Sequence, residues 1–548
     1  MPSKLHRSAA IIIKRGPEEL RNFFIPSFIP TLRSLPKFHR LMSRHYVGTR
    51  RVSLPILTPS PSEALCEGRV TISPKECNHS TIELKVRQVE MFIPLLAITT
   101  IAFFSQTFSF GFVSDDFFYL SFTRFADVIS PIEGFYHYSP VFWMLMWFLK
   151  ILFGYNPLPF HITSVVLHLV NVIIFYKVTS FFLKDKLSRY FSSIIFAFYF
   201  AHYEIVYWVT GIDMSLMISF YLLGFLAFLM YTKRHKTRFL LFYYSLFTIA
   251  ILTHEYATSL AFITLIYWIF FSKKKMKTKD VMKIVAFPIV VIMILVIFKL
   301  SDSSPIFVHG PSALRFLTSI VKSFLYLLFP FPLIIDRLSQ GMQILLFLIV
   351  VCRLVLKGNR KKETLFLLVW MFIIVSVYSV SSLPQARYLS LASIPAILLF
   401  LRLFQVRSLL SINSLYLIMI FISGIFFLNN QKIYWEKGSR ISRNVVSDVK
   451  SLYPDLPKGK ILYFVNLPDS VNGPPWNAYV FRNGLDHALA HEYNGDIPTL
   501  SYRRTTPIDG KVREDEPIEI EELRKLKSGG NIVFVFDEEN ESVKILDE

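Results

Sequence analysis

The sequence is poor in cysteine and in charged residues, and these two shortages exclude several classes of protein. Three cysteines in 548 residues cannot supply a disulfide framework. Charged residues make up 18% of the chain, whereas soluble globular proteins contain about 25%. Hydrophobic residues reach 53%, which excludes disorder of the chain as a whole. The class that remains is a multi-pass membrane protein.

The net charge of +20 is spread unevenly over three parts of the chain. Residues 1–90 hold 15 Lys and Arg against seven acids, residues 91–428 hold 28 against 12, and residues 429–548 hold 16 against 20. The first part lacks sustained hydrophobic periodicity and predicts a basic, mostly disordered tail. Its composition resembles a transit peptide. A cytosolic tail explains it as well, and so does translation from an upstream start site, in which case Met91 would be the true start.

The middle part contains recurring apolar segments near the ~20 residues that a helix needs to cross a bilayer. It predicts a mainly α-helical membrane bundle with about eleven transmembrane helices. The predicted segments are Met91–Phe112, Phe160–Phe182, Leu187–Ala201, Met214–Tyr231, Phe239–Leu252, Tyr256–Phe271, Val281–Leu300, Met342–Leu356, Thr364–Ser381, Leu389–Phe404 and Leu409–Leu428. A twelfth segment, Leu314–Ile335, contains Pro330 and Pro332 and is predicted to be re-entrant or interfacial.

Basic loops set the predicted orientation. Twenty of the 28 basic residues in the middle part fall between alternate helices, and basic loops stay in the cytoplasm. The charge therefore records membrane topology, and we expect the bilayer and not nucleic acid as its partner. The N-terminus is predicted to be cytoplasmic, in a plasma or inner membrane. Residues 429–548, with strand patterns at Lys460–Val465 and Asn531–Phe536, are predicted to form a small extracytoplasmic α/β domain.

This orientation places nine of the 12 acids of the middle part at the outer face, where solvated or paired carboxylates cost least. They are Asp115, Asp116, Asp127, Glu133, Glu204, Asp213, Glu255, Asp302 and Asp336.

The adjacent carboxylates of Asp115 and Asp116 lie among aromatic residues just after the first predicted helix. Such a pair suits a general base beside a second polar or metal-binding group. Ser114-Asp115-Asp116 is equally compatible with a solvated helix cap.

Two further groups of polar residues are predicted at the same face. One group could line a cavity and consists of His202, Glu204, Asp213, His254 and Glu255. Histidine and glutamate side chains together can bind a divalent ion, but no spacing here matches a metal motif. Hydrogen-bonded loop residues explain this group as well. Arg387-Tyr388 could bind a phosphate group or anchor a helix at the interface.

Several motifs, taken in order, resemble the GT-C superfamily of integral-membrane glycosyltransferases. The nearest resemblance is to bacterial and archaeal relatives of the dolichyl-phosphate-mannose protein mannosyltransferases. The matching stretches are Phe112-Val-Ser-Asp115-Asp116-Phe-Phe-Tyr119, Tyr138-Ser-Pro140, Phe153-Gly154-Tyr-Asn156-Pro157, Phe160-His161, His168-Leu-Val-Asn171, Ala197–Asp213, His254-Glu255 and Arg387-Tyr388. His254 departs from the usual Lys, and the acidic pair is Asp-Asp where many relatives have Asp-Glu.

The resemblance implies inverting transfer of a sugar from a polyprenyl-phosphate donor to a lipid, glycan or protein acceptor at the outer face. It implies that Asp115 is the general base and that Asp116 orients it or contacts a metal. Arg387 and Tyr388 would contact the donor phosphate, and His202, Glu204, Asp213, His254 and Glu255 would line the cavity. Mg²⁺ or Mn²⁺ could bind at Asp116 or Glu255.

Other functions remain compatible with the sequence. A secondary transporter usually shows inverted repeats and ionisable residues near the midplane of the bilayer, and the sequence shows no such repeat. A polymerase or ligase of surface polysaccharide would use the same chemistry with a glycan acceptor. A non-catalytic membrane scaffold would keep the fold without the reaction.

Overall fold

The structure is a computed structural model, and its described residues fall within the unit Asn78–Glu548. Residues 91–546 are described except for gaps at 131–136, 273–277, 302–311, 329–348, 350–351, 353–360, 381–383, 405–411, 457–459, 474–475, 494, 496–498, 503–523, 526 and 529. The predicted tail (1–90), nearly all of the predicted helix Met342–Leu356, and Glu133, Asp302 and Asp336 lie outside the described residues.

The predicted membrane bundle is confirmed. Within the described ranges, seven helices are long and apolar enough to cross a bilayer, and the protein is therefore an integral membrane protein. They are Met91–Ser109, α6 (Pro157–Thr179), α9 (Ile212–Arg234), Lys279–Ile297 within α12 (Thr278–Ser301), Lys362–Ser379 within α15 (Lys361–Ser379), α16 (Ala386–Leu403) and α17 (Ile412–Leu452). Shorter apolar helices are α5 (Pro140–Phe153), α10 (Thr237–Thr253) and α11 (Ser259–Phe271), which follows the 3-10 turn η4 (Glu255–Thr258).

The count of about eleven spanning helices is not reached in the part of the chain that the structure describes. The predicted helix Leu187–Ala201 is α7 (Lys186–Ala197), which has 12 residues. At 1.5 Å per residue it is about 18 Å long, shorter than the ~30 Å hydrocarbon core. The chain then continues through the 3-10 turn η3 (Phe200–His202) and the five-residue helix α8 (Tyr203–Tyr207) into α9.

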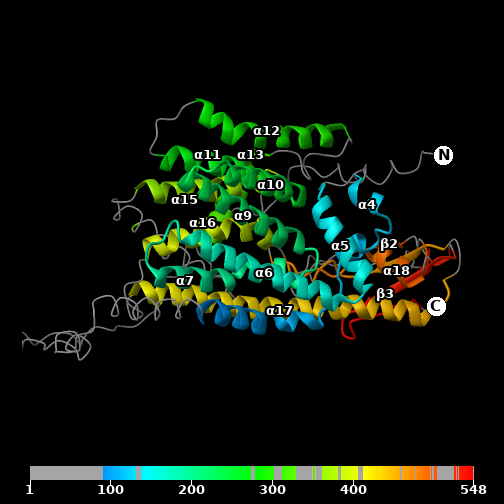
Figure 1. Ribbon diagram of the computed structural model, residues 1–548. Helices are drawn as coiled ribbons and strands as arrows, with labels where there is room; N and C mark the ends of the chain where they lie inside the picture. Colours follow the sequence, from blue (N-terminus) through cyan, green and yellow to red (C-terminus); the bar gives the residue numbers. More distant parts are fainter. Residues whose placement is uncertain are drawn as a thin grey trace, which may run out of the picture. The chain divides into compact units, whose positions relative to one another are not determined.

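The helices run alongside one another (Figure 1). Their buried shares differ greatly. Helix α16 is the most enclosed, with 89% of its 18-residue window buried, and it contacts α15, α7 and α13 (Ala313–Leu328). Helix α12 lies at the edge with 11% buried, as expected for a helix that faces lipid. Helix α13 exposes Leu314, Leu317 and Val321 and buries Ser319 and Ser323, an amphipathic pattern compatible with the predicted interfacial placement.

Helix α17 joins the bundle to the residues that follow it, which we call the C-terminal domain although they belong to the same unit as the bundle. It is continuous over 41 residues, so the predicted boundary between residues 428 and 429 falls inside a helix about 60 Å long. Its first half contacts α7, η3 and α8, and its second half contacts α18 (Leu485–Tyr493) and strand β4 (Ser542–Ile545) (Figure 1). No proline or glycine pair interrupts the segment Tyr434–Leu452, so nothing in the sequence ends the helix at the membrane edge.

The C-terminal domain contains a four-stranded sheet in the order β2-β1-β3-β4. Strands β2 (Thr499–Tyr502), β1 (Leu462–Val465) and β3 (Ile532–Asp537) are parallel, and β4 pairs antiparallel with β3. The predicted strands at Lys460–Val465 and Asn531–Phe536 are thus confirmed as β1 and β3. Both are rich in β-branched and aromatic residues, which the pleated, half-buried surface favours.

Charged side chains of α9 and α16 lie at the ends of these helices. Helix α9 has Asp213 in its first turn and Lys233 and Arg234 in its last, and α16 has Arg387 near its start and Arg402 in its last turn. At the C-terminal end of α16, Arg402 forms an ion pair with Glu363, at the start of α15, at 2.9 Å. The opposite end, where α9 and α16 begin, holds the predicted polar residues.

Candidate functional site

Asp116 is a buried structural carboxylate. It is 1% exposed and lies in the first turn of the short helix α3 (Asp115–Leu120). Its Oδ2 accepts a hydrogen bond from the backbone N–H of Val113 at 2.9 Å, and its Oδ1 accepts from the backbone N–H and the hydroxyl of Thr210 at 2.8 and 2.7 Å. Asp116 therefore connects the first loop to the loop that precedes α9.

Burial and hydrogen bonding act in opposite directions on Asp116. Burial raises the pKa of its carboxyl group to about 7, against the Thr210 hydroxyl and two backbone N–H donors, which lower it. The negative charge of Asp115 raises it further. Both protonation states of Asp116 are therefore accessible near neutral pH.

Asp115 is the more accessible member of the pair. Its side chain is half-buried, and its Oδ1 accepts a hydrogen bond from the side-chain amide of Asn483 at 2.7 Å. The predicted cap is not formed, because Ser114 makes no side-chain cap hydrogen bond. Instead, Ser114 has a left-handed backbone with φ of 50°, donates its N–H to the Val480 carbonyl at 2.7 Å and accepts from the Asn483 N–H at 3.3 Å.

The side chain of Arg387 is held in a fixed orientation by a buried acid. Its guanidinium pairs with Glu204, and its backbone N–H donates to the same carboxylate at 3.0 Å. Glu204 is 2% exposed, whereas 15% of the Arg387 side chain is exposed. The guanidinium also lies 5.2 Å from the ring centre of Trp208 and donates to the hydroxyl of Tyr388 at 3.3 Å. One face of this cation is therefore fixed by protein while part of it remains accessible.

The buried phenol of Tyr119 is influenced by the charges of both the acids and the cation. Burial raises the pKa of its hydroxyl well above the ordinary value. The negative charges of Asp115 and Asp213 raise this pKa further, while the positive charge of Arg387 lowers it. Three residues far apart in sequence thus lie within electrostatic range of one phenol.

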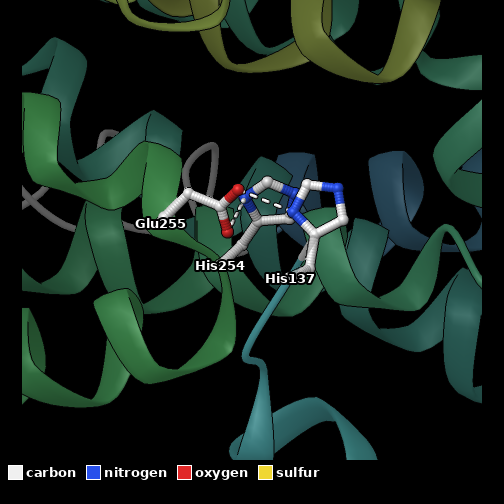
Figure 2. A group of neighbouring side chains, drawn as sticks. All are labelled: His137, His254 and Glu255. Carbon is white, nitrogen blue, oxygen red and sulfur yellow. Dashed lines mark hydrogen bonds and ion pairs between the residues drawn. The ribbon is translucent and has the colours of Figure 1, made fainter. Parts of the chain in front are cut away.

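A second cluster of polar side chains lies beside Asp213. His254 Nε2 is 3.9 Å from Asp213 Oδ2, and His254 Nδ1 is 3.7 Å from Glu255 Oε2. The other oxygen of Glu255 is 2.6 Å from Nδ1 of His137, in the loop that leads into α5. Figure 2 shows the Glu255 carboxylate directed at both imidazole rings.

His202 does not join these residues. Its side chain is completely buried, with Nε2 3.2 Å from the Ser393 hydroxyl, and it packs edge to face on Phe196 and His168. Tyr388 is buried at 6% exposure and stacks on Tyr378. The structure thus brings together Asp115, Asp116, Glu204, Asp213, His254, Glu255, Arg387 and Tyr388, and it places His202 inside the bundle.

Some members of the site carry no signal in the sequence. Asn483 and Tyr479, whose hydroxyl is 3.5 Å from the Arg387 guanidinium, come from the C-terminal domain. Thr210 is one hydroxyl in an apolar loop, and His137 is one histidine among aromatic residues. No spacing rule connects such single residues to a site, because their partners are hundreds of positions away or in another loop.

The fold and this site define an integral membrane protein with paired carboxylates, a held arginine and a histidine cluster at one end of its helical bundle. No family model matches the sequence, and no curated protein matches it. The chain is similar to solved structures of ArnT from Cupriavidus metallidurans in two states. For the one bound to undecaprenyl phosphate, identity is 12%, coverage is 75% of this chain and 85% of that chain, and the TM-score is 0.42. For the apo state, identity is 12%, coverage is 82% and 93%, and the TM-score is 0.44.

Proposed function

We propose that this protein is a GT-C-type glycosyltransferase that moves a sugar from a polyprenyl-phosphate donor to an acceptor at the outer face of the membrane. The observation that carries the proposal is that one segment contacts both the carboxylate and the cation at one end of an apolar bundle. Asn483 donates to Asp115 Oδ1 at 2.7 Å, and the Tyr479 hydroxyl lies 3.5 Å from the Arg387 guanidinium. A lipid-linked donor needs a carboxylate for the acceptor, a cation for the phosphate and an apolar path for the chain. The ordered motifs of the sequence support the same reaction.

In this reaction Asp115 takes the proton of the acceptor hydroxyl or amine. The acceptor atom attacks the anomeric carbon from the side opposite the phosphate, so a new glycosidic bond forms and the bond to the phosphate oxygen breaks with inversion. Asp115 suits this role better than Asp116, because Asp116 is 1% exposed and already accepts three hydrogen bonds.

Arg387 would balance the charge of the departing polyprenyl phosphate. A guanidinium binds phosphate oxygens through paired N–H donors, and its fixed orientation against Glu204 and Trp208 limits the entropy lost on binding. Tyr388 supports this orientation through its hydroxyl. Asp213, His254 and Glu255 would line the sugar side of the cavity.

The test uses the purified full-length chain in lipid bilayers with radiolabelled polyprenyl-phosphate sugars. We expect donor turnover by the wild-type chain and a loss of at least about 100-fold in kcat for Asp115→Asn, the scale of general-base catalysis. Asp127→Asn is the matched control, since Asp127 follows α3 closely in the chain but accepts hydrogen bonds from neighbouring exposed residues, among them the backbone N–H and the guanidinium of Arg124.

If the Asp115→Asn variant turns over donor at the wild-type rate, Asp115 is not the general base. Passage of the sugar across the bilayer with its donor bond intact would favour the transporter. A donor that binds but is never cleaved by the wild-type chain, across hexose and pentose donors, would favour the scaffold.

A further inference from the structure

His137, His254 and Glu255 form a compact group of metal-type ligands. One ligand atom from each of the three residues lies within 4.8 Å of the other two. His254 and Glu255 are adjacent in the turn between α10 and α11, and His137 reaches them from the loop before α5 (Figure 2). The two imidazole rings are 5.2 Å apart at an angle of 40°, so they do not stack face to face.

The donor positions are close to those of a tetrahedral site. With metal–ligand bonds of about 2.0–2.1 Å, ligand atoms of a tetrahedral zinc site lie about 3.3 Å apart. Glu255 Oε1 is 2.6 Å from His137 Nδ1, and Glu255 Oε2 is 3.7 Å from His254 Nδ1. One ligand atom from each residue lies within 4.8 Å of the others, so small side-chain rotations would be needed to reach tetrahedral separations.

The protonation of His254 also suits a metal ligand. Its Nδ1 accepts the backbone N–H of Tyr256 at 3.3 Å, so Nδ1 carries a lone pair and no proton. Its Nε2 faces Asp213 at 3.9 Å, and a carboxylate in this place fixes the tautomer and orientation of a metal-bound imidazole. An ion at Nδ1 would replace the long hydrogen bond from Tyr256.

We propose that His137, His254 and Glu255 bind one divalent transition-metal ion, with zinc as the best match. Two imidazoles and one carboxylate suit Zn²⁺, whereas Mg²⁺ prefers oxygen ligands alone. Three protein ligands leave a fourth position open, as in metal sites that also bind a substrate or water. Asp116, whose oxygens accept three protein hydrogen bonds, is not among these ligands.

The position of the site indicates what the ion would do. Asp213 Oδ2 lies 3.9 Å from His254 Nε2, and the charges of Arg387, His137 and Glu255 all act on the Asp213 carboxyl group. A bound dication would therefore add positive charge beside the arginine and assist the binding of an anionic group there. This consequence rests on the proposed function, but the metal site itself does not.

The experiment measures metal directly on the untagged, full-length protein in detergent. After equilibration with zinc and removal of free metal, elemental analysis should give about one zinc per chain. X-ray absorption should show two imidazole ligands at about 2.0–2.1 Å. His137→Ala and His254→Ala should each reduce retained zinc at least about tenfold, as should Asp213→Asn through its contact with His254.

His235→Ala is the matched control, because this histidine lies in an exposed turn at the far end of α9. Wild-type protein without retained zinc, or zinc without imidazole ligands in the absorption spectrum, would overturn the site, and neither result needs a variant to fold. Full retention of zinc in a folded His137→Ala, His254→Ala double variant would overturn it as well. If the protein binds zinc but does not transfer sugar, the metal site is supported and only the proposed glycosyltransferase function is rejected.

Discussion

Asn483 donates a hydrogen bond from its side-chain amide to Oδ1 of Asp115 at 2.7 Å, across 368 positions of sequence. Two contacts of Ser114 reinforce this approach, one from the Asn483 N–H at 3.3 Å and one to the Val480 carbonyl at 2.7 Å. Gly484 follows with φ of 82°, and a Cβ atom there would collide with the Ser114 carbonyl oxygen. The C-terminal domain thus supplies part of the environment of the proposed base.

Replacing Asn483 tests whether this contact positions Asp115. Asn483→Ala removes a hydrogen bond to a charged group, worth about 1.5–3 kcal/mol. If that bond is fully used in the transition state, we expect kcat to fall about 10- to 100-fold with little change in KM. Asn477→Ala is the control, because its amide binds Ser470 within the same domain. An equal loss of activity in both variants would indicate general damage to the domain.

Replacing Glu204 alone should lower the thermal stability of the protein far more than replacing Glu204 and Arg387 together. Glu204→Gln leaves the guanidinium without its partner, and breaking a buried pair costs about 3–5 kcal/mol. We expect a large loss of thermal stability in detergent, most of which is restored in the Glu204→Gln, Arg387→Met double variant. Additive effects of the two replacements would contradict this coupling.

The carboxyl group of Asp116 should make stability depend on pH. Burial raises its pKa from 3.8 to about 7, so the folded state holds the proton more tightly than the unfolded state. Its contribution to stability is therefore complete below pH 4 and is lost as the pH rises to 7, by at most about 4 kcal/mol. The stability of the wild-type chain relative to Asp116→Asn should fall between pH 4 and 7. A constant difference over this range would show that the pKa is not raised.

The orientation predicted from the basic loops can be tested with single cysteines in a chain whose three natural cysteines are replaced by serine. An impermeant thiol reagent applied from outside should label Asn540→Cys in the C-terminal domain. It should not reach His235→Cys, beside Lys233 and Arg234 at the other end of α9. Both positions are exposed, so burial cannot explain a difference. Labelling at residue 235 would reverse the topology.

Local patterns were sufficient to predict most helices and two strands, because apolar runs and β-branched runs determine which segments are buried. The same patterns failed where length or continuity depends on tertiary packing. Helix α7 ends at Ala197, and the chain turns at η3, which places His202 inside the bundle although Glu204, two residues later, reaches Arg387. A residue pattern at 202–204 contains no information about which side chain turns inward.

The partners of the site residues were harder to predict than the residues themselves. Carboxylates in an apolar chain are scarce, so their positions alone marked Asp115 and Asp213. The partners Asn483, Thr210 and His137 are ordinary polar residues in unremarkable surroundings. Only the folded chain brings them to the acids.

Helix α17 has a consequence for the order in which the protein is made. It is the last helix of the bundle, and the segment that contains Asn483 and Gly484 follows it. A ribosome must therefore finish every described helix of the bundle before the first loop receives its amide from Asn483. A nascent chain that stops short of residue 484 would insert its helices without the contacts to Asp115 and Ser114, so the site is completed only after the described helices of the bundle have been made.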